Sequence, residues 1–268
     1  MKNILTKNVL FVAAFASITN FCIASPNHNQ DTTLLAANTA KSAAVTVKEV
    51  NVDYPSLLQD QKVQSISYVQ KYSETKREYL TLMYKKGATY FPQIIPILKQ
   101  YNVPEEMKVL IALESNFNGN AVSRAGAVGY WQMMDAVAMD YGLSIGKTKG
   151  KKKKGLADDR KNFYRSTVAA ARFLRDQYKQ FNNDMLLAVA SYNCGAGNVM
   201  KAIRRSGVTD ASFWDIKKFL PAETRNYVMN FITLNVIFNN YDKFENKDLV
   251  FAPQMIQNYD PAPTSIVN

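Results

Sequence analysis

Residues 184–192 read DMLLAVASY, and every position from Met185 to Ala190 is apolar. A helix built from this run has no polar side, so other helices must surround it in the folded protein. We find neither an alternating strand pattern nor an internal repeat elsewhere. The sequence therefore predicts a mainly α protein with one helical domain at 59–245 and its core at 100–235. Further apolar stripes at helical spacing support it: Phe91, Ile94, Ile95 and Leu98, and Tyr227, Phe231, Leu234 and Phe238.

The N-terminus has the features of a secretory signal peptide. Lys2 and Lys7 flank the start of an apolar stretch that runs to Ile23, and the small residue Ala24 follows. The stretch is short and interrupted by polar residues, which disfavours the alternative of a membrane anchor. Cleavage of residues 1–24 removes two lysines and no acid, so the formal charge falls from +11 to +9. We therefore expect an exported protein of the periplasm or cell envelope, with a polyanionic partner such as cell wall, lipid surface or nucleic acid.

Two flanking segments contain few large apolar residues. Residues 25–58 are rich in Asn, Thr, Ala and Ser, which predicts a flexible linker, and residues 246–268 contain three prolines, which predicts an extended, weakly packed tail. The only histidine, His28, lies in the linker, and Cys194 is the only cysteine after residue 24. The folded region therefore lacks a Ser/His or Cys/His pair, a disulfide and a zinc site, and we expect no cofactor or metal.

Residues 147–154 contain a run of lysines between Gly146 and Gly155. Like charges repel, so this segment is expected to be a solvated loop. One interpretation is a surface insertion without a dedicated role, and the other is electrostatic contact with anionic wall polymer or membrane. Because no aromatic residue interleaves the lysines, we do not expect a nucleic-acid site.

Glu114 interrupts the apolar face of a predicted helix. Met107, Leu110 and Ile111 mark that face at steps of three and four, and Glu114 is the next position on it. A carboxyl placed there is either bonded to structural partners or partly desolvated, in which case its pKa rises. A raised pKa suits a general acid, so Glu114 is the leading catalytic candidate, with a structural role as the alternative.

Three further motifs supply polar and aromatic groups. The helix of Glu114 is expected to end near Asn116, followed by a Gly-rich loop and another helix from about Gln132. Tyr130 and Trp131 in that loop either stack on sugar rings or pack in the core. Beyond it, Tyr192 and Asn193 come just before a Gly-containing turn, and Tyr227 follows a helix start at Pro221. Asn193 and Gly195 could equally be a plain helix cap.

These motifs together resemble the soluble lytic transglycosylase catalytic domain, and more narrowly the membrane-bound lytic murein transglycosylase D subgroup. The resemblance runs from about Pro104 to Val228. It includes the departures Tyr130, Trp131 and Cys194, where relatives have leucine, methionine and a small residue. The motifs are Glu114-Ser115, Gly126-Ala127-Val128-Gly129-Tyr130-Trp131-Gln132, Ala190-Ser191-Tyr192-Asn193-Cys194-Gly195-Ala196-Gly197 and Glu223-Thr224-Arg225-Asn226-Tyr227-Val228.

The resemblance implies a lysozyme-like helical domain whose substrate cleft binds the glycan strands of peptidoglycan. By the same resemblance Glu114 is the catalytic acid/base, and Ser115 orients it or contacts the substrate. Four other residues are expected to line the cleft: Gln132, Tyr192, Asn193 and Tyr227.

The reaction expected from a single motif carboxylate is non-hydrolytic. Ordinary glycosidases use two carboxylates, whereas Asp135 and Asp140 lie on the helix after Glu114 with nothing to pair them with it. The 2-acetamido group of the substrate would then stabilise the sugar cation, and its 6-hydroxyl would attack, giving a 1,6-anhydromuramoyl end. The alternatives are a hydrolytic muramidase on the same fold and a non-catalytic wall-binding protein.

Overall fold

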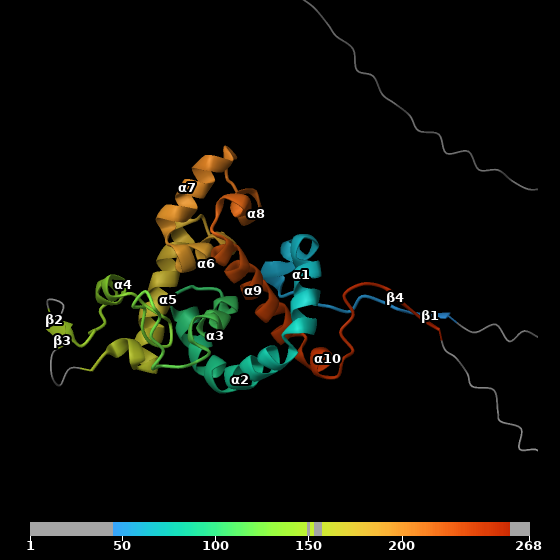
Figure 1. Ribbon diagram of the computed structural model, residues 1–268, viewed down its shortest axis with the longest axis horizontal. Helices are drawn as coiled ribbons and strands as arrows, with labels where there is room; N and C mark the ends of the chain where they lie inside the picture. The colour runs from blue at the N-terminus through green and yellow to red at the C-terminus, as the bar shows by residue number, and fades with distance from the viewer. Residues whose placement is uncertain (1–44, 149–150, 153–156, 258–268) are drawn as a thin grey trace, which may run out of the picture. The chain divides into compact units, whose positions relative to one another are not determined.

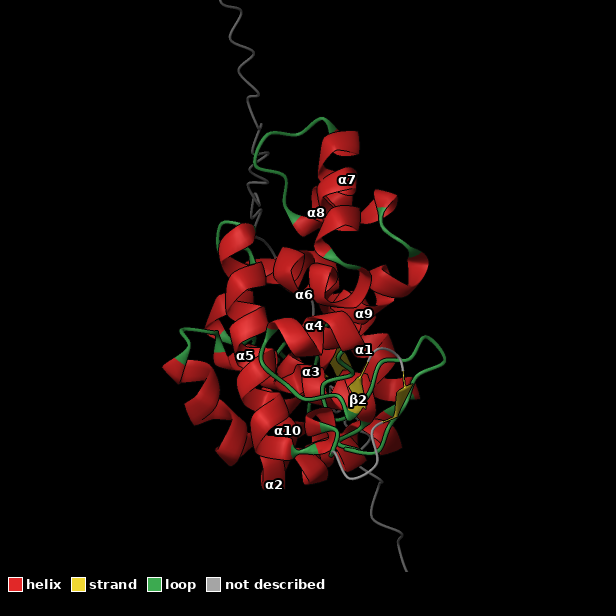
Figure 2. Ribbon diagram, turned by 90° about the vertical axis from the view of Figure 1, so that its left-hand side faces the viewer, coloured by secondary structure: helices red, strands yellow, loops and turns green. Residues whose placement is uncertain are grey.

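The computed structural model describes residues 45–148, 151–152 and 157–257. Within these ranges the regular structure is almost entirely helical, so the predicted mainly α class is confirmed (Figure 2). The longer helices are α1 (Lys62–Thr75), α2 (Arg77–Gln100), α5 (Phe163–Gln180), α6 (Met185–Cys194), α7 (Ala196–Ser206) and α9 (Ala222–Asn239). The shorter ones are η1 (Ser56–Gln61), η2 (Glu105–Val109), α3 (Leu110–Ser115), α4 (Asp135–Asp140), η3 (Asp159–Lys161), α8 (Phe213–Ile216), η4 (Lys217–Phe219) and α10 (Tyr241–Glu245).

Helix α6 is the central helix that its sequence predicts. Every side chain from Met185 to Ser191 is buried, and α5, α7 and α9 pack around it. Its start is fixed locally, because the Asp184 carboxylate accepts a hydrogen bond from the backbone N–H of Leu187 at 2.9 Å. The apolar run and its cap therefore define a helix that needs burial, and α5, α7 and α9 supply the surfaces that bury it.

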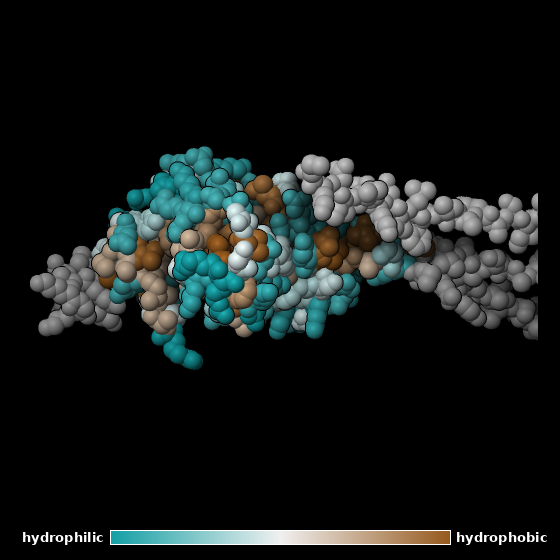
Figure 3. Space-filling view, turned by 90° about the horizontal axis from the view of Figure 1, so that it is seen from above, coloured by the Kyte–Doolittle hydropathy of each residue, from teal (hydrophilic) through white to brown (hydrophobic). Residues whose placement is uncertain are grey.

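Helix α9 contacts helices from both the early and the late parts of the described chain. It packs against α1 on one side and against α6 and α3 on the other, as Figure 1 shows. Phe231 and Leu234 of its predicted stripe are fully buried, while Tyr227 and Phe238 at the stripe's ends are half-buried. Seen from the side of α7 (Figure 3), hydrophilic residues surround small apolar patches. No helix in the described ranges is long and apolar enough to span a bilayer.

The ends of the described chain are better ordered than the sequence analysis expects. Strand β1 (Val45–Lys48) pairs antiparallel with β4 (Gln254–Gln257), so the linker and the tail meet. Val52, Tyr54 and Leu58, at the end of the expected linker, are buried in the core. Three apolar residues in a polar context are too few to stand out in the sequence, yet all three are buried, and the Tyr54 hydroxyl lies 3.0 Å from that of Ser65 on α1. The expected signal peptide, His28 and residues 258–268 lie outside the described residues.

The lysine segment contains a short hairpin rather than only loop. Strand β2 (Lys147–Thr148) pairs antiparallel with β3 (Lys151–Lys152). Residues 149–150 and 153–156 lie outside the described ranges. The pairing sets the backbone of Lys147 opposite that of Lys152, and Thr148 opposite Lys151.

Candidate active site

Glu114 lies in the last turn of α3, where the sequence analysis places it. The helix ends at Asn116, whose left-handed backbone (φ 52°) caps it as predicted. Ile111, Ala112 and Ser115 around Glu114 are buried, whereas Glu114 itself is half-buried. The carboxyl group is therefore held at the boundary between core and solvent.

Tyr227 of α9 is the direct partner of this carboxyl. Its phenol donates a hydrogen bond to Oε1 of Glu114 at 2.5 Å, across 113 residues of sequence. Burial, followed by the nearby Glu114 charge, raises the pKa of Tyr227 well above its ordinary value. Tyr227 therefore stays protonated at neutral pH and can act as a hydrogen-bond donor.

The second oxygen of Glu114 is open. Among the described residues no group bonds to Oε2, and every buried side-chain nitrogen or oxygen there has a partner. Oε2 must therefore reach solvent. One oxygen is fixed by the protein and the other is available to a ligand.

The protonation of Glu114 is tuned to neutral pH. The pKa of Glu114 is raised from 4.5 to about 7: burial is the largest cause, the hydrogen bond from Tyr227 acts against it, and the negative charge of Glu223 adds to it. Glu223 is exposed in the first turn of α9 and makes no hydrogen bond to Glu114. A carboxyl titrating near 7 is populated in both forms at neutral pH, which suits a group that gives and then takes a proton.

Ser115 is engaged with the backbone. Its hydroxyl donates to the carbonyl of Tyr130 at 2.7 Å and accepts from the N–H of Asn118 at 3.2 Å. Of the two roles implied by the resemblance, this arrangement supports orientation: the hydroxyl ties the end of α3 to the loop at 117–134.

Gln132 lies within that loop rather than at the start of a helix. Its backbone is left-handed (φ 45°), and α4 begins only at Asp135. The side-chain amide donates to the carbonyls of Gly129 and Ala121 at 2.8 and 3.1 Å. No described group bonds to its Oε1, which is therefore open for a ligand. The expected helix start near Gln132 is wrong because the loop bends back on itself through bridges at Val128.

Tyr192 and Asn193 come to the site from the end of α6. The Tyr192 hydroxyl donates to the carbonyl of Trp131 at 2.7 Å, and Asn193 Oδ1 accepts from Thr224 Oγ1 of α9 at 2.8 Å. After burial, the charge of Glu114 is the next cause that raises the pKa of Tyr192, so the two groups are neighbours. Asn193 Nδ2 has no described partner and faces solvent. All five expected site residues thus lie on segments that contact one another around Glu114.

The aromatic pair of the loop serves mainly in packing. Trp131 is fully buried and its indole N–H donates to Thr167 Oγ1 at 3.0 Å. Tyr130 is half-buried and its ring lies 5.3 Å from that of Phe163. The core alternative therefore holds for Trp131.

A buried ion-pair cluster that no sequence motif predicted supports the loop. Arg160 is 1% exposed and binds Asp135 at 2.6 Å, Asp158 at 2.7 Å and the Met133 carbonyl at 3.1 Å. Gly129 (φ +88°) lies against the Arg160 backbone, where a Cβ would approach the carbonyl oxygen to 1.9 Å. The signal in the sequence was Asp158-Asp159-Arg160, three consecutive charged residues just before the amphipathic helix α5. Asp135 is thus held by Arg160.

Comparison with known proteins agrees with these motifs. Residues 93–214 match the model of the transglycosylase SLT domain family. The chain is 34% identical over 177 residues to membrane-bound lytic murein transglycosylase D of Escherichia coli K12, covering 65% of this chain and 37% of that protein. It is 32% identical over 118 residues to a tributyltin chloride resistance protein of Alteromonas sp. that is itself described as unproven, covering 44% and 53%. The lytic transglycosylase Slt of Pseudomonas aeruginosa, at 19% identity, gives a TM-score of 0.45 and covers 62% of this chain and 26% of its own.

Proposed function

We propose that this protein is an exported peptidoglycan lytic transglycosylase, because residues 93–214 match the transglycosylase SLT domain family. The proposed reaction is non-hydrolytic cleavage of the β-1,4 bond between N-acetylmuramic acid and N-acetylglucosamine. The chain spans about a third (37%) of the length of the lytic murein transglycosylase D that it matches. The observation that carries the proposal is the carboxyl of Glu114, with a pKa near 7, one oxygen fixed by Tyr227 and one oxygen open.

In the first half of the reaction Glu114 acts as the acid. Tyr227 donates to Oε1, so the carboxyl proton resides on Oε2, the oxygen that reaches solvent. From there it is transferred to the bridging oxygen as the bond from that oxygen to the anomeric carbon breaks. The departing N-acetylglucosamine end leaves as a neutral alcohol.

In the second half Glu114 acts as the base. The 2-acetamido group of the muramic acid stabilises the positive charge at the anomeric carbon, and the 6-hydroxyl of the same sugar then attacks that carbon. Oε2 takes the hydroxyl proton, which restores the acid and leaves a 1,6-anhydromuramoyl end. No water is consumed, so one carboxyl suffices.

The surrounding residues have two kinds of role: some position the loop beside Glu114, and others are available to contact the substrate. Ser115 and Tyr192 fix the loop by bonding to the carbonyls of Tyr130 and Trp131. The open acceptor Oε1 of Gln132 and the open donor Nδ2 of Asn193 are suited to sugar hydroxyl and acetamido groups. We therefore assign positioning to Ser115 and Tyr192, and substrate contact to Gln132 and Asn193, within a cleft that stays a prediction.

A hydrolytic muramidase is the second candidate, and Glu223 is the observation that favours it. The negative charge of Glu223 raises the pKa of Glu114, as the charge of a second catalytic carboxylate would do. Digestion of purified sacculi followed by mass analysis separates the two reactions, because the anhydro product is lighter by one water. Finding only reducing ends would overturn the transglycosylase proposal.

The lysine segment is proposed to hold the enzyme on anionic wall polymer or membrane. The supporting observation is the β2–β3 pairing, in which the backbone of Lys147 lies opposite that of Lys152. Replacing Lys151 to Lys154 by glutamine should reduce co-sedimentation with sacculi at low salt, and the difference should shrink at high salt. Equal binding of the two proteins at low salt would leave the segment an inert insertion.

A further inference from the structure

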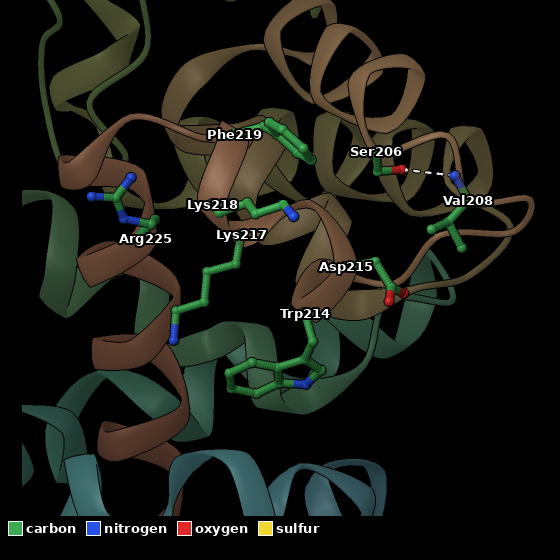
Figure 4. Close-up of a pocket in the computed structure, with 8 residues that line it drawn as sticks. All are labelled: Ser206, Val208, Trp214, Asp215, Lys217, Lys218, Phe219 and Arg225. Carbon is green, nitrogen blue, oxygen red and sulfur yellow. Dashed lines mark hydrogen bonds between the residues drawn. The ribbon is translucent and has the colours of Figure 1, made fainter.

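A hollow lined by positive charges lies on the opposite side of α9 from Glu114. Its volume is about 740 Å³, and Trp214, Lys217, Lys218, Phe219 and Arg225 are among its lining residues (Figure 4). Lys217 Nζ approaches Met229 Sδ to 3.6 Å, and Arg225 and Met229, four residues apart, share one face of α9. Tyr227, two positions from each, is on the other face. The hollow is therefore separate from the candidate active site.

The cations of the hollow have no carboxylate partners among the described residues. Lys217 lies 4.7 Å from the centre of the Trp214 ring and Lys218 lies 5.0 Å from that of Phe219. Arg225 donates to the Leu220 carbonyl at 2.7 Å. Rings and carbonyls orient a cation without cancelling its charge, so these three positive charges remain uncompensated.

The one acid in the lining is already engaged. Asp215 accepts hydrogen bonds from the backbone and the hydroxyl of Ser212, at 2.9 and 2.6 Å, and so closes the capping box of α8. Burial, and after it the charge of Arg225, lower the pKa of Lys217. A lowered pKa is expected for a half-buried ammonium without a counter-ion. An anion bound in the hollow would raise the pKa of Lys217 again.

The lining suits extended carboxylates better than a compact phosphate. A phosphate is typically held by converging backbone N–H groups at a helix start, whereas here the cations come from two elements and are separated by aromatic faces. Carboxylates spaced by methyl and methylene groups would meet cation and ring in turn. The single carboxylate at the rim, Asp215, disfavours a densely anionic polymer.

We propose that this hollow binds a short peptide rich in carboxylates, of the kind that branches from the glycan strands of peptidoglycan. The inference rests on the proposed function for the identity of the peptide.

Tryptophan fluorescence tests the proposal without any cleavage. The chain has two tryptophans: Trp131, fully buried in the core, and Trp214, in the wall of the hollow. Titration with a synthetic acidic stem tetrapeptide should change the emission saturably, and Trp214→Phe should abolish the change. An analogue with its carboxylates amidated should bind at least about tenfold more weakly, because charge-assisted contacts are lost.

Matched variants assign the binding to the hollow. Lys217→Met with Lys218→Gln should weaken peptide binding by about tenfold or more, and Lys218→Gln alone, an exposed change that leaves packing intact, by a few-fold. The control, Lys85→Gln with Lys201→Gln, removes the same charge from exposed positions outside the hollow and should bind as the wild type.

Three results would overturn the inference: equal binding of the amidated peptide, equal weakening by the control pair, or saturable binding of inorganic polyphosphate in place of the peptide. The probe contains no sugar, so a loss of the transglycosylase proposal leaves this measurement interpretable, and failure here leaves that proposal standing.

Discussion

The two faces of α9 each lie beside a half-buried charged group: the carboxyl of Glu114 on one face and the ammonium of Lys217 on the other. On one face Tyr227 holds a half-buried carboxyl, and on the other Arg225 neighbours a half-buried ammonium, Lys217. Burial favours the neutral form of both groups, so it raises the pKa of Glu114 and lowers that of Lys217. For the carboxyl this brings titration to neutral pH and creates a proton donor. For the ammonium it leaves a charge that a bound anion would stabilise.

The two faces also differ in how firmly they are held. Around Glu114 the loop is fixed by hydrogen bonds from Ser115, Gln132 and Tyr192 and by the buried Arg160 cluster. The hollow on the other face is lined by ring contacts and one helix cap. Substitutions on the Glu114 face should therefore affect turnover and folding, whereas those in the hollow should affect binding alone.

The sharpest test of this contrast is Glu114→Gln. The amide cannot donate a proton and recover it, so release of anhydro fragments from sacculi should fall by about 10²–10⁴-fold, while sacculus binding persists. Mass analysis of the soluble products measures the loss. Unchanged release would remove Glu114 from the chemistry.

The same variant should also change how the free energy of unfolding depends on pH. The pKa of Glu114 is higher in the folded state (about 7) than in the unfolded state (4.5), so the protonated carboxyl favours folding. This contribution to the free energy of unfolding is complete below about pH 4.5 and is lost as the pH rises through about 7. Wild type should therefore lose stability relative to Glu114→Gln across that window, by up to about 3 kcal/mol before allowance for partial exposure. Urea unfolding at pH 4 and pH 8 measures the difference, and a gap that does not grow with pH would contradict the raised pKa.

The next largest effect should come from Arg160→Met. Methionine keeps much of the volume but leaves Asp135 and Asp158 without their buried partner, so the free energy of unfolding should fall by about 3–5 kcal/mol. Chemical denaturation measures it, with Arg204→Met, at an exposed position of α7, as the control. Equal stability of the two variants would mean that the cluster does not hold the loop.

Tyr227→Phe should lower turnover less than Glu114→Gln does, and it should shift the pH dependence of activity. Loss of the hydrogen bond to Glu114 should lower turnover by about tenfold. The bond lowers the pKa of Glu114, so its removal should move the basic limb of the activity profile to higher pH. Activity measured from pH 5 to 9 tests this, and a limb that moves to lower pH would contradict the assignment of Tyr227 as donor.

Glu223→Gln should change activity least, and it should shift the pH profile in the direction opposite to that of Tyr227→Phe. Its charge raises the pKa of Glu114, so the variant should move the basic limb to lower pH. An exposed charge is well screened, so the rate at the optimum should change by no more than about fivefold. A loss as large as that of Glu114→Gln would instead identify Glu223 as a second catalytic carboxylate and favour hydrolysis.

Local features of this protein could be predicted because their causes are local. The apolar run of α6 needs burial wherever it lies, Asp184 caps the helix that follows it, and Asn116 ends the helix of Glu114. The position of Glu114 on an apolar face already indicated a perturbed carboxyl. These features depend on residues a few positions apart, and short-range geometry is the same in every fold.

The partnerships that give Glu114 its properties were decided only by the tertiary structure. Tyr227 is 113 residues away, and nothing in its own segment shows that α9 brings it to α3. The same holds for the Arg160 cluster, for β1 with β4, and for the cationic hollow between α8 and α9. The sequence by itself determined the apolar run of α6, the end of the helix that carries Glu114 and the apolar stripe of α9. Which faces meet depends on the packing of all helices at once, and that packing alone fixes the hydrogen-bond partner and the pKa of the central carboxyl.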